Sequence, residues 1–256
     1  MAVDSLSKEV SGKVAIATTT LYKPDSESDR IRSQLAERTA RIAGEIGYEF
    51  VVVDSGSPDD FLSELQRYGA KLYPRKPTTM GEGRRDAIRT AYDTGKPVIA
   101  WLEPEKCNYV LELANTVVPI LEGKADLVVP RRRSLDSYHE FQQLTEKVGN
   151  LYWRDLTGID LDVWFGPRTW EKNLSEYFLR YAGEYGDEWH TIFIPLLDII
   201  ADNHKVIGVD IEYAHPKEQA EIEKHSIEFH AKRIRGLSVL TEALKSHFGK
   251  LNEPAH

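Results

Sequence analysis

VAIATTTLYKPDSESDRIRSQLAERTARIAGEIGYEFVVVDSGSP, residues 14–58, is the stretch that decides the fold class. It opens on a short apolar run, 14–17, which ends in a polar loop at Thr18, as a buried strand feeding a loop would. Apolar residues then recur at steps of three and four, the period of an amphipathic helix. A second buried run, 50–53, is rich in β-branched residues and is closed by turn formers from Asp54 onward. The stretch therefore predicts one strand–helix–strand unit.

The same alternation continues beyond this unit. It predicts an α/β class with a mostly parallel central sheet, flanked by helices and joined by right-handed crossovers. Ligands bind such sheets outside the carboxyl ends of the strands, so the loops at Thr18, Asp54 and Glu103 should converge on one crevice. The expected helices are 59–68, 82–94, 108–121, 137–156, 191–202 and 216–248, and the expected strands are 70–73, 97–102, 125–129 and 206–213, with 163–167 crossing back toward the sheet.

Composition narrows the function classes. The chain has 256 residues, 41% of them hydrophobic, which is enough for a real core, and we find no internal repeat or low-complexity linker. A net charge of -8 argues against bulk nucleic-acid binding. The single Cys107 cannot form an internal disulfide, residues 1–13 lack the apolar region of a secretory signal, and no run approaches the roughly 18 apolar residues of a membrane span. We therefore expect one cytoplasmic domain without an integral membrane segment.

Glu103 and Glu105 are candidate metal ligands. They follow the expected strand 97–102 with one residue between them, and extended geometry puts residues two apart on the same side. Both carboxylates can then face one hard cation such as Mg²⁺ or Mn²⁺, which prefers oxygen ligands. A solvated acidic turn explains the same pair equally well.

A second candidate site lies at the start of the helix 82–94. There Gly81, Gly83, Arg84 and Arg85 combine free backbone N–H groups with two guanidinium groups, which suit the phosphates of a nucleotide. An ordinary loop before a helix also explains the two glycines. Asp54 can accept hydrogen bonds from a base or ribose, or it can cap the turn that follows it.

Taken in order, these segments resemble the family-2-like glycosyltransferases of the GT-A fold, especially the branch with the dolichol-phosphate mannose synthases and glucosyl-3-phosphoglycerate synthases. The resemblance implies a GT-A fold, a nucleotide-sugar donor, a small-molecule acceptor and a divalent metal, Mg²⁺ or Mn²⁺. The matching segments are ATTT (17–20), VVVDSGS (51–57), GEG (81–83), AYDTGKPVIAWLEPE (91–105), FGPR (165–168) and YAHP (213–216).

Site roles follow from the resemblance position by position. It divides one GT-A domain, 1–256, into a nucleotide-binding half at 1–125, an acceptor-side half at 126–220 and a C-terminal helical tail at 221–256. The implied donor contacts are Thr18, Thr20, Tyr22 and Asp54, with Gly81, Gly83, Arg84 and Arg85 near the phosphates. The implied metal ligands are Glu105, Glu103 and His215.

The acceptor side rests on arginines. Arg131, Arg132 and Arg133 follow an expected strand in an acidic protein, and guanidinium groups match phosphate or carboxylate oxygens two at a time. We therefore expect a small anionic acceptor held by this run, with help from Arg168. A solvated loop paired with nearby acids explains the run as well.

Asp187 and Glu188 are the candidate general bases. They stand just before the apolar helix 191–202, where a glycosyltransferase that inverts configuration would carry the carboxylate that takes the acceptor proton. The helix dipole also favours acids at this position without any catalytic role.

Two other functions stay open. A catalytically degenerate GT-A domain would bind a nucleotide sugar or a partner without turnover, because the chain has Glu103 and Glu105 where the family mostly has aspartates. A sugar nucleotidyltransferase would have the same kind of sheet, but it would need a Gly-rich loop after the first strand. Residues 18–24 contain no glycine. A homodimer is also left open.

Overall fold

The computed structural model describes residues 5–23, 25–76 and 79–253; Pro24, in the first polar loop, lies outside these ranges. The strands are β1 Val14–Thr20, β2 Glu49–Asp54, β3 Lys71–Pro74, β4 Val98–Trp101, β5 Leu127–Arg132, β6 Arg168–Glu171 and β7 Val206–Ile211. The helices are α1 Ser5–Ser11, α2 Glu27–Ile46, α3 Asp59–Arg67, α4 Met80–Asp93, α5 Cys107–Leu121, α6 Glu140–Thr157, α7 Ser175–Arg180, α8 His190–Ala201, α9 Lys217–Lys224 and α10 Ile227–Leu251, with 3-10 turns η1 Val163–Phe165 and η2 Lys172–Leu174.

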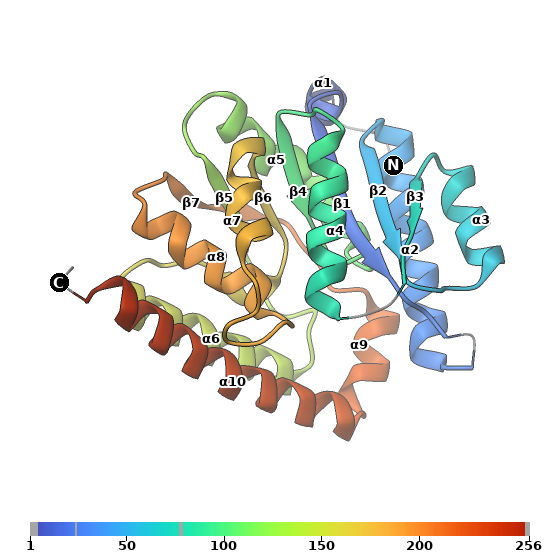
Figure 1. Cartoon of the computed structure of the whole chain (residues 1–256). Coiled ribbons are helices and arrows are strands. Elements are labelled where there is room, and N and C mark those ends of the chain that lie inside the picture. Colours follow the sequence, from blue (N-terminus) through green and yellow to red (C-terminus); the bar gives the residue numbers. More distant parts are fainter. Residues whose placement is uncertain (1–4, 24, 77–78, 254–256) are drawn as a thin grey trace.

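The seven strands form one sheet in the order β3-β2-β1-β4-β6-β5-β7 (Figure 1). Only β6 runs antiparallel to its neighbours β4 and β5, so the mostly parallel sheet expected from the sequence is confirmed. The expected crossing at 163–167 is corrected, because residues 163–165 form a 3-10 turn and the strand begins at Arg168. Gly166, with a φ of 94°, lets the chain turn between them.

Side chains alternate between the two faces of the sheet, so each face builds its own core. On one face, Ile16 and Val52 pack in a cluster that includes side chains of α2, α3 and α5. On the other face, Ala17 and Val53 belong to a cluster with α4, α6, α7, α8 and α10. Figure 1 shows the resulting layers of helix, sheet and helix.

The C-terminal region differs from the single helix expected at 216–248. It forms two helices, α9 and α10, separated at His225 and Ser226, where the Ser226 side chain accepts a hydrogen bond from Phe229 N and starts α10 anew. Leu240 and Leu244 bury α10 against the rest of the fold. In Figure 1, α10 crosses the molecule on the side toward which β1 and β2 point.

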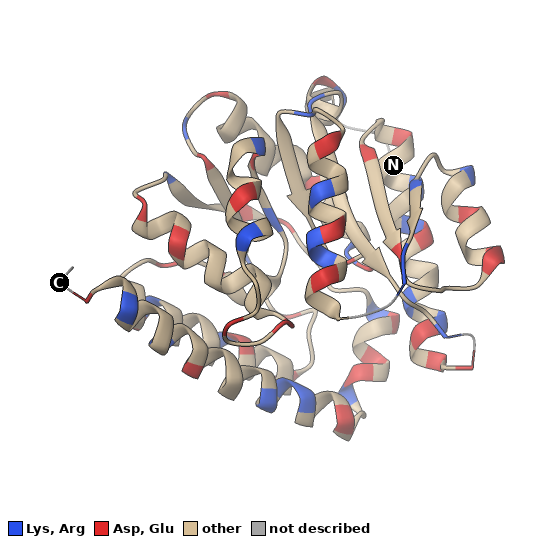
Figure 2. Ribbon diagram, in the orientation of Figure 1, with Lys and Arg blue, Asp and Glu red and all other residues tan. Residues whose placement is uncertain are grey.

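The outer helices carry both signs of charge. Figure 2 shows acidic and basic residues interspersed along the ribbons of α4 and α10. Within the described ranges, no helix is both long enough and apolar enough to cross a bilayer.

Candidate functional site

The parallel strands β2, β1 and β4 lie side by side, so their carboxyl ends share one edge of the sheet. Thr20 stands opposite Asp54 in the β1–β2 register, and Ala17 stands opposite Trp101 in the β1–β4 register. The loops that follow the three strands therefore meet at this edge, and the loop after β4 carries Glu103.

The polar side chains at the ends of β1 and β2 bond to one another. Thr18 Oγ1 donates to a backbone carbonyl just after β4 at 2.8 Å, and Thr20 Oγ1 donates to Asp54 Oδ1 at 2.7 Å. Asp54 also accepts hydrogen bonds from the backbone N–H groups of Gly56 at 2.8 Å and Ser57 at 3.0 Å. Asp54 thus has the turn-capping role, and a nucleotide contact would use what remains of its accepting capacity.

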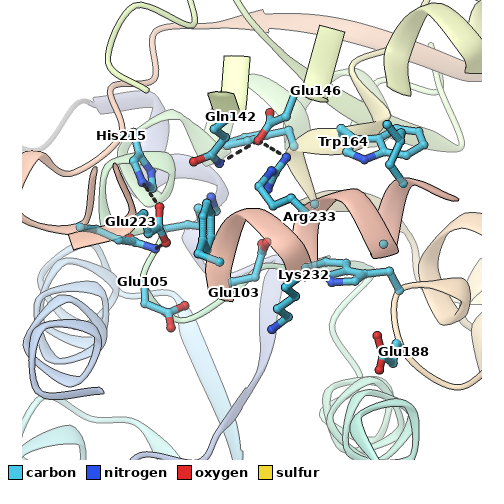
Figure 3. A pocket seen from close by; sticks show the side chains of 18 of the residues that line it. Glu103, Glu105, Gln142, Glu146, Trp164, Glu188, His215, Glu223, Lys232 and Arg233 are labelled. Atoms are coloured by element: carbon cyan, nitrogen blue, oxygen red, sulfur yellow. Dashed lines mark hydrogen bonds and ion pairs between the residues drawn. The ribbon is translucent and has the colours of Figure 1, made fainter. Parts of the chain in front are cut away.

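A cavity of about 230 Å³ opens beside this edge, beneath the C-terminal helices (Figure 3). Its walls come from the loop after β4, the segment 164–166, the loop before α8, and helices α2, α6, α9 and α10. Its charged or ionisable lining residues are Arg32, Glu103, Glu105, Lys106, Glu146, Glu188, His215, Glu223, Lys232 and Arg233.

Glu105 lies in the cavity wall beside the first loop. Its Oε1 accepts a hydrogen bond from the Tyr22 hydroxyl at 3.2 Å. Burial raises the pKa of Glu105, and the nearby positive charge of Arg32 opposes that rise. Figure 3 shows the carboxylate directed into the cavity, where it is accessible to a bound molecule or ion.

Glu103 faces the same cavity. Its Oε2 is buried without a hydrogen-bond partner among the described residues. Its Oε1 lies against Gly166, where an added Cβ would come within 2.5 Å of it. A buried carboxylate oxygen without a partner calls for an explanation, and a bound cation is one.

His215 lies in the same wall and is held by Glu223. Its Nε2 lies 3.1 Å from Glu223 Oε2, and its ring stacks on Tyr138 with 4.3 Å between centroids. Burial lowers the pKa of His215, so the ring is neutral near pH 7. Burial alone would raise the pKa of Glu223, but hydrogen bonds from His215 and Gln219 bring it down to about 2. Because Glu223 accepts the Nε2 proton, His215 Nδ1 keeps its lone pair, and it is buried without a partner among the described residues.

Glu103, Glu105 and His215 line the same cavity and carry the kinds of atom that bind a divalent cation, two carboxylates and a ring nitrogen with a free lone pair. A histidine that gives one N–H to a carboxylate and keeps the other nitrogen free has the usual arrangement of a metal-ligating histidine. Among the residues that the structure describes, however, no three His, Cys, Asp or Glu side chains lie close enough together to hold a metal ion, so these three do not form an assembled metal site in this structure. Mg²⁺ or Mn²⁺ held by these residues would complete its coordination with water or substrate phosphate oxygens.

The start of α4 is tied to the loop before α8. Arg85 Nη1 binds Asp187 Oδ1 at 2.6 Å, and the Thr79 hydroxyl donates to Asp187 Oδ2. A side chain on Gly81 would collide with Asp187, so the glycine allows this close approach. Burial raises the pKa of Asp187, but the hydrogen bonds from Arg85 and Thr79 hold it below its ordinary value. Neither Arg85 nor Asp187 lines the cavity, and the Asp187 carboxylate already accepts hydrogen bonds from Arg85 and Thr79.

Arg84 is buried beneath the same loop. It donates to Thr191 Oγ1 at 3.0 Å and to the Glu188 carbonyl, and its guanidinium lies 4.3 Å from the Trp189 ring centroid. Burial lowers the pKa of Arg84 to about 10, so it stays protonated at neutral pH. Gly83 is also tightly placed, since an added Cβ would meet a guanidinium of the preceding loop at 3.1 Å. Arg84 therefore supports the loop that carries Glu188.

Glu188 is the acid of the predicted pair that lines the cavity. Its side chain is exposed, and its carboxylate has no hydrogen bond or ion pair within the described part of the chain. Figure 3 shows Glu188 across the opening from Glu105. Of the two predicted bases, Glu188 is the one free to accept a proton from a bound molecule.

The arginine run at the end of β5 lies outside the cavity lining. Arg131 pairs with Asp210 at 2.5 Å and Arg133 pairs with Glu212 at 2.5 Å, with all four side chains exposed. Arg132 points to the opposite face because successive strand side chains alternate. The run is thus divided between an exposed face, with Arg131 and Arg133, and the protein interior, with Arg132.

The two buried arginines predicted for the acceptor have internal partners. Arg132 forms a two-pronged pair with Asp162, at 2.7 Å for each prong, and also pairs with Glu146. Arg168 is fully buried and donates to the Val163 carbonyl at 2.6 Å. The structure does not bring the arginines predicted for the acceptor together, and neither the run nor Arg168 lines the cavity.

The sequence reasoning missed the cations that do line the cavity. Arg32 comes from α2, Lys106 follows Glu105, and Lys232 and Arg233 come from α10. The run KRIRG at 232–236, a basic cluster that ends in a glycine, was the sequence feature that could have indicated them.

No protein-family model matches the chain, and no curated protein matches it significantly. Solved structures do match. Glucosyl-3-phosphoglycerate synthase from Mycobacterium tuberculosis with Mn²⁺, UDP-glucose and glycerol 3-phosphate superposes with a TM-score of 0.66 at 16% identity, covering 97% of this chain and 85% of that one. The same enzyme with Mn²⁺, UDP and glucosyl-3-phosphoglycerate gives 0.65 at 15% identity, and with phosphoglyceric acid 0.63 at 18%, with the same coverage. The GT-A fold expected from the sequence is therefore confirmed.

Proposed function

We propose that this chain is a glycosyltransferase that moves a sugar from a nucleoside diphosphate sugar to a small acceptor with the help of a divalent metal. The observation that carries the proposal is the cavity at the carboxyl edge of a GT-A sheet, which gathers Glu103, Glu105 and His215. Structures of the same fold hold Mn²⁺ with UDP or UDP-glucose, which supports this choice of substrate.

The donor nucleotide has a natural path in this proposal. It would lie along the loops after β1 and β2 and reach the start of α4, whose backbone N–H groups suit phosphate. Arg84 and Arg85 would act through the loop that they hold. The residues proposed along this path are Thr18, Thr20, Tyr22, Asp54, Gly81 and Gly83.

The chemistry assigns separate tasks to the cavity residues. A divalent cation, when bound, supplies positive charge to the diphosphate oxygens. In the transfer, the bond between the anomeric carbon and the diphosphate oxygen breaks, and its electron pair stays on that oxygen. The acceptor hydroxyl oxygen bonds to the anomeric carbon and its proton passes to Glu188. Tyr22 orients Glu105, and Glu223 orients His215.

We propose a small anionic acceptor, now held by cavity cations instead of the arginine run at β5. Lys106 is the candidate, because its ammonium lies 5.2 Å from the Phe165 ring centroid and 5.6 Å from that of Tyr213. Two ring faces fix the position of this cation without neutralising it, so an anion can still bind.

The test is a panel of UDP-, GDP- and ADP-sugars with Mn²⁺ or Mg²⁺, each with glycerol 3-phosphate, 3-phosphoglycerate or uncharged glycerol. We expect one donor to release nucleoside diphosphate faster when a phosphorylated acceptor is present. Pyrophosphate release would identify a nucleotidyltransferase, and donor binding without turnover would identify a binding domain.

Glu105→Gln serves as the loss-of-function variant, and Glu45→Gln, on the exposed side of α2, as its matched control. We expect Glu105→Gln to lower turnover by more than about 100-fold, because even the outer partners of metal ligands cost about 10- to 100-fold. Full activity of Glu105→Gln would remove Glu105 from the site.

A further inference from the structure

The face of α10 that closes the cavity follows one helical stripe. Its lining residues are spaced by three and four along the helix, so they share one side of it. They are Phe229, Lys232, Arg233, Gly236, Leu237 and Leu240. The C-terminal helix is therefore the roof of the cavity.

The basic side chains that line the cavity differ in whether they already form ion pairs or hydrogen bonds within the protein. Arg32 pairs with Glu223 at 3.3 Å. Arg233 pairs with Glu146 at 3.0 Å and donates to Thr145 at 2.9 Å. Within the described ranges Lys232 has no carboxylate within 4.0 Å, no hydrogen bond and no aromatic ring beneath its ammonium.

Lys232 is directed into the cavity. Lys232 lines the cavity together with Glu105 and Glu188, and in the view of Figure 3 its side chain extends from α10 toward the side of the cavity on which both carboxylates lie. The Lys232 ammonium makes no ion pair with the carboxylates that line the cavity. It is therefore available to an anionic group of a bound ligand. That ligand would carry a cation toward Glu105.

Gly236 keeps this part of the roof open. It lies one turn after Lys232 on the same stripe, and a Cβ added to it would meet nothing within 4 Å. Its φ is not positive, so neither backbone conformation nor packing requires glycine. The missing side chain widens the cavity next to the free ammonium.

We propose that Lys232 forms a phosphate subsite in the roof, binding the diphosphate of the donor on the side opposite Glu105. The inference rests on the proposed function and adds a residue to it. A diphosphate is the group that can meet carboxylate-bound metal on one side and an ammonium on the other. Lys232 then compensates the charge left on the diphosphate when the sugar departs.

The experiment compares Lys232→Ala and Lys232→Arg with Lys245→Ala, an exposed lysine on α10 that does not line the cavity. Calorimetric titration with UDP, GDP and ADP in the presence of Mn²⁺ gives the dissociation constant of each protein. A hydrogen bond to a charged group contributes about 1.5–3 kcal/mol, so Lys232→Ala should weaken nucleoside diphosphate binding about 10- to 100-fold. Lys232→Arg should recover most of that loss, and Lys245→Ala should bind as the wild type does.

The outcomes separate the two proposals. If the wild type binds none of the three nucleotides, both the proposed function and the phosphate subsite at Lys232 are overturned. If the wild type binds one and Lys232→Ala binds it equally well, only the phosphate subsite is overturned. A change confined to the acceptor's KM would also overturn it, by moving Lys232 to the acceptor. Equal melting temperatures of the variants would exclude a folding defect as the cause.

Discussion

Glu103 Oε2 and His215 Nδ1 are both buried without a hydrogen-bond partner among the described residues. Leaving a buried polar atom unpaired costs about 1–3 kcal/mol. Two such atoms on the wall of one cavity indicate that the folded protein gives up stability there, and a bound cation would recover it. Stability given up at one place is typical of functional sites.

His190 allows a prediction on pH. Both of its ring nitrogens are buried without partners in the described part of the chain, and burial lowers its pKa, with Glu188 and Asp187 opposing the shift and Arg84 adding to it. The folded pKa therefore lies below the unfolded value of about 6.5. The unfolded chain takes up the proton first, so the free energy of unfolding falls as the pH drops below about 6.5, by at most about 1.4 kcal/mol per pH unit.

His190→Leu removes this titration, and we expect its unfolding free energy to vary less between about pH 7 and pH 5. Urea unfolding of both proteins at several pH values measures the two slopes. His225→Leu, which changes an exposed histidine, is the control and should keep the wild-type slope. Identical slopes in wild type and His190→Leu would show that His190 is not the group responsible.

The arginines of β5 predict contrasting effects on stability. Arg132→Ala removes the cation that Asp162 and Glu146 share in the interior and leaves Asp162 without an ion-pair partner among the described residues, while Glu146 keeps Arg233, and we expect a loss of about 3–5 kcal/mol. Arg131→Ala and Arg133→Ala break exposed pairs and should cost about 0–1 kcal/mol. Chemical denaturation of the three variants measures the difference. A large loss of acceptor affinity in Arg131→Ala, at unchanged stability, would restore the arginine run as an acceptor site.

At the scale of elements, α10 contributes to both stability and the site. Leu240 and Leu244 anchor it in the core, and Arg233 ties it to α6 through Glu146. The other side of the roof is held by Arg32 of α2, which reaches Glu223 of α9. The cavity is thus closed by elements far apart in the chain, each of which is held by ion pairs.

Gly236→Ala should raise the free energy of unfolding by about 0.5–1 kcal/mol, because alanine is the better helix former and meets no neighbour there. Gly236→Leu should fill the cavity beside Lys232 and weaken nucleoside diphosphate binding without unfolding the helix. Urea unfolding and calorimetric titration measure the two effects. Gly249→Leu, at another open position of α10, is the control and should leave binding unchanged. Undiminished binding to Gly236→Leu would place the ligand elsewhere.

At the scale of the whole molecule, ligand binding and folding are linked. A ligand that binds only the folded protein stabilises it by about 2.7 kcal/mol at 100 times its dissociation constant. For a chain of this size each kcal/mol shifts the melting temperature by about 2–4 °C, so nucleoside diphosphate with Mn²⁺ should raise it by about 5–10 °C. Thermal melts with and without EDTA measure the shift. EDTA and Glu105→Gln should each abolish most of it, whereas Glu45→Gln should keep it.

Much of the fold could be predicted because its signals are local. The apolar runs of β1, β2 and β4 and the helical period of α2 predict strand, helix and strand without knowledge of their neighbours. Neighbouring parallel strands have their carboxyl ends at the same edge of the sheet, so the sequence also predicted that Glu103 and Glu105 lie at this edge. The direction of β6 and the break at Ser226 did not follow, because each depends on where the chain packs on the rest of the protein.

The sequence by itself therefore determined the class of sheet, the edge where the cavity lies and the two carboxylates after β4. Only the tertiary structure decided which charges are free to bind. Arg132 is neutralised by Glu146 and Asp162, and Arg32 meets Glu223, a residue 191 positions away. Lys232 stays unpaired within the described chain. The physical reason is that a charge is neutralised by whatever lies within a few ångströms of it, and in a folded chain those neighbours come from distant positions.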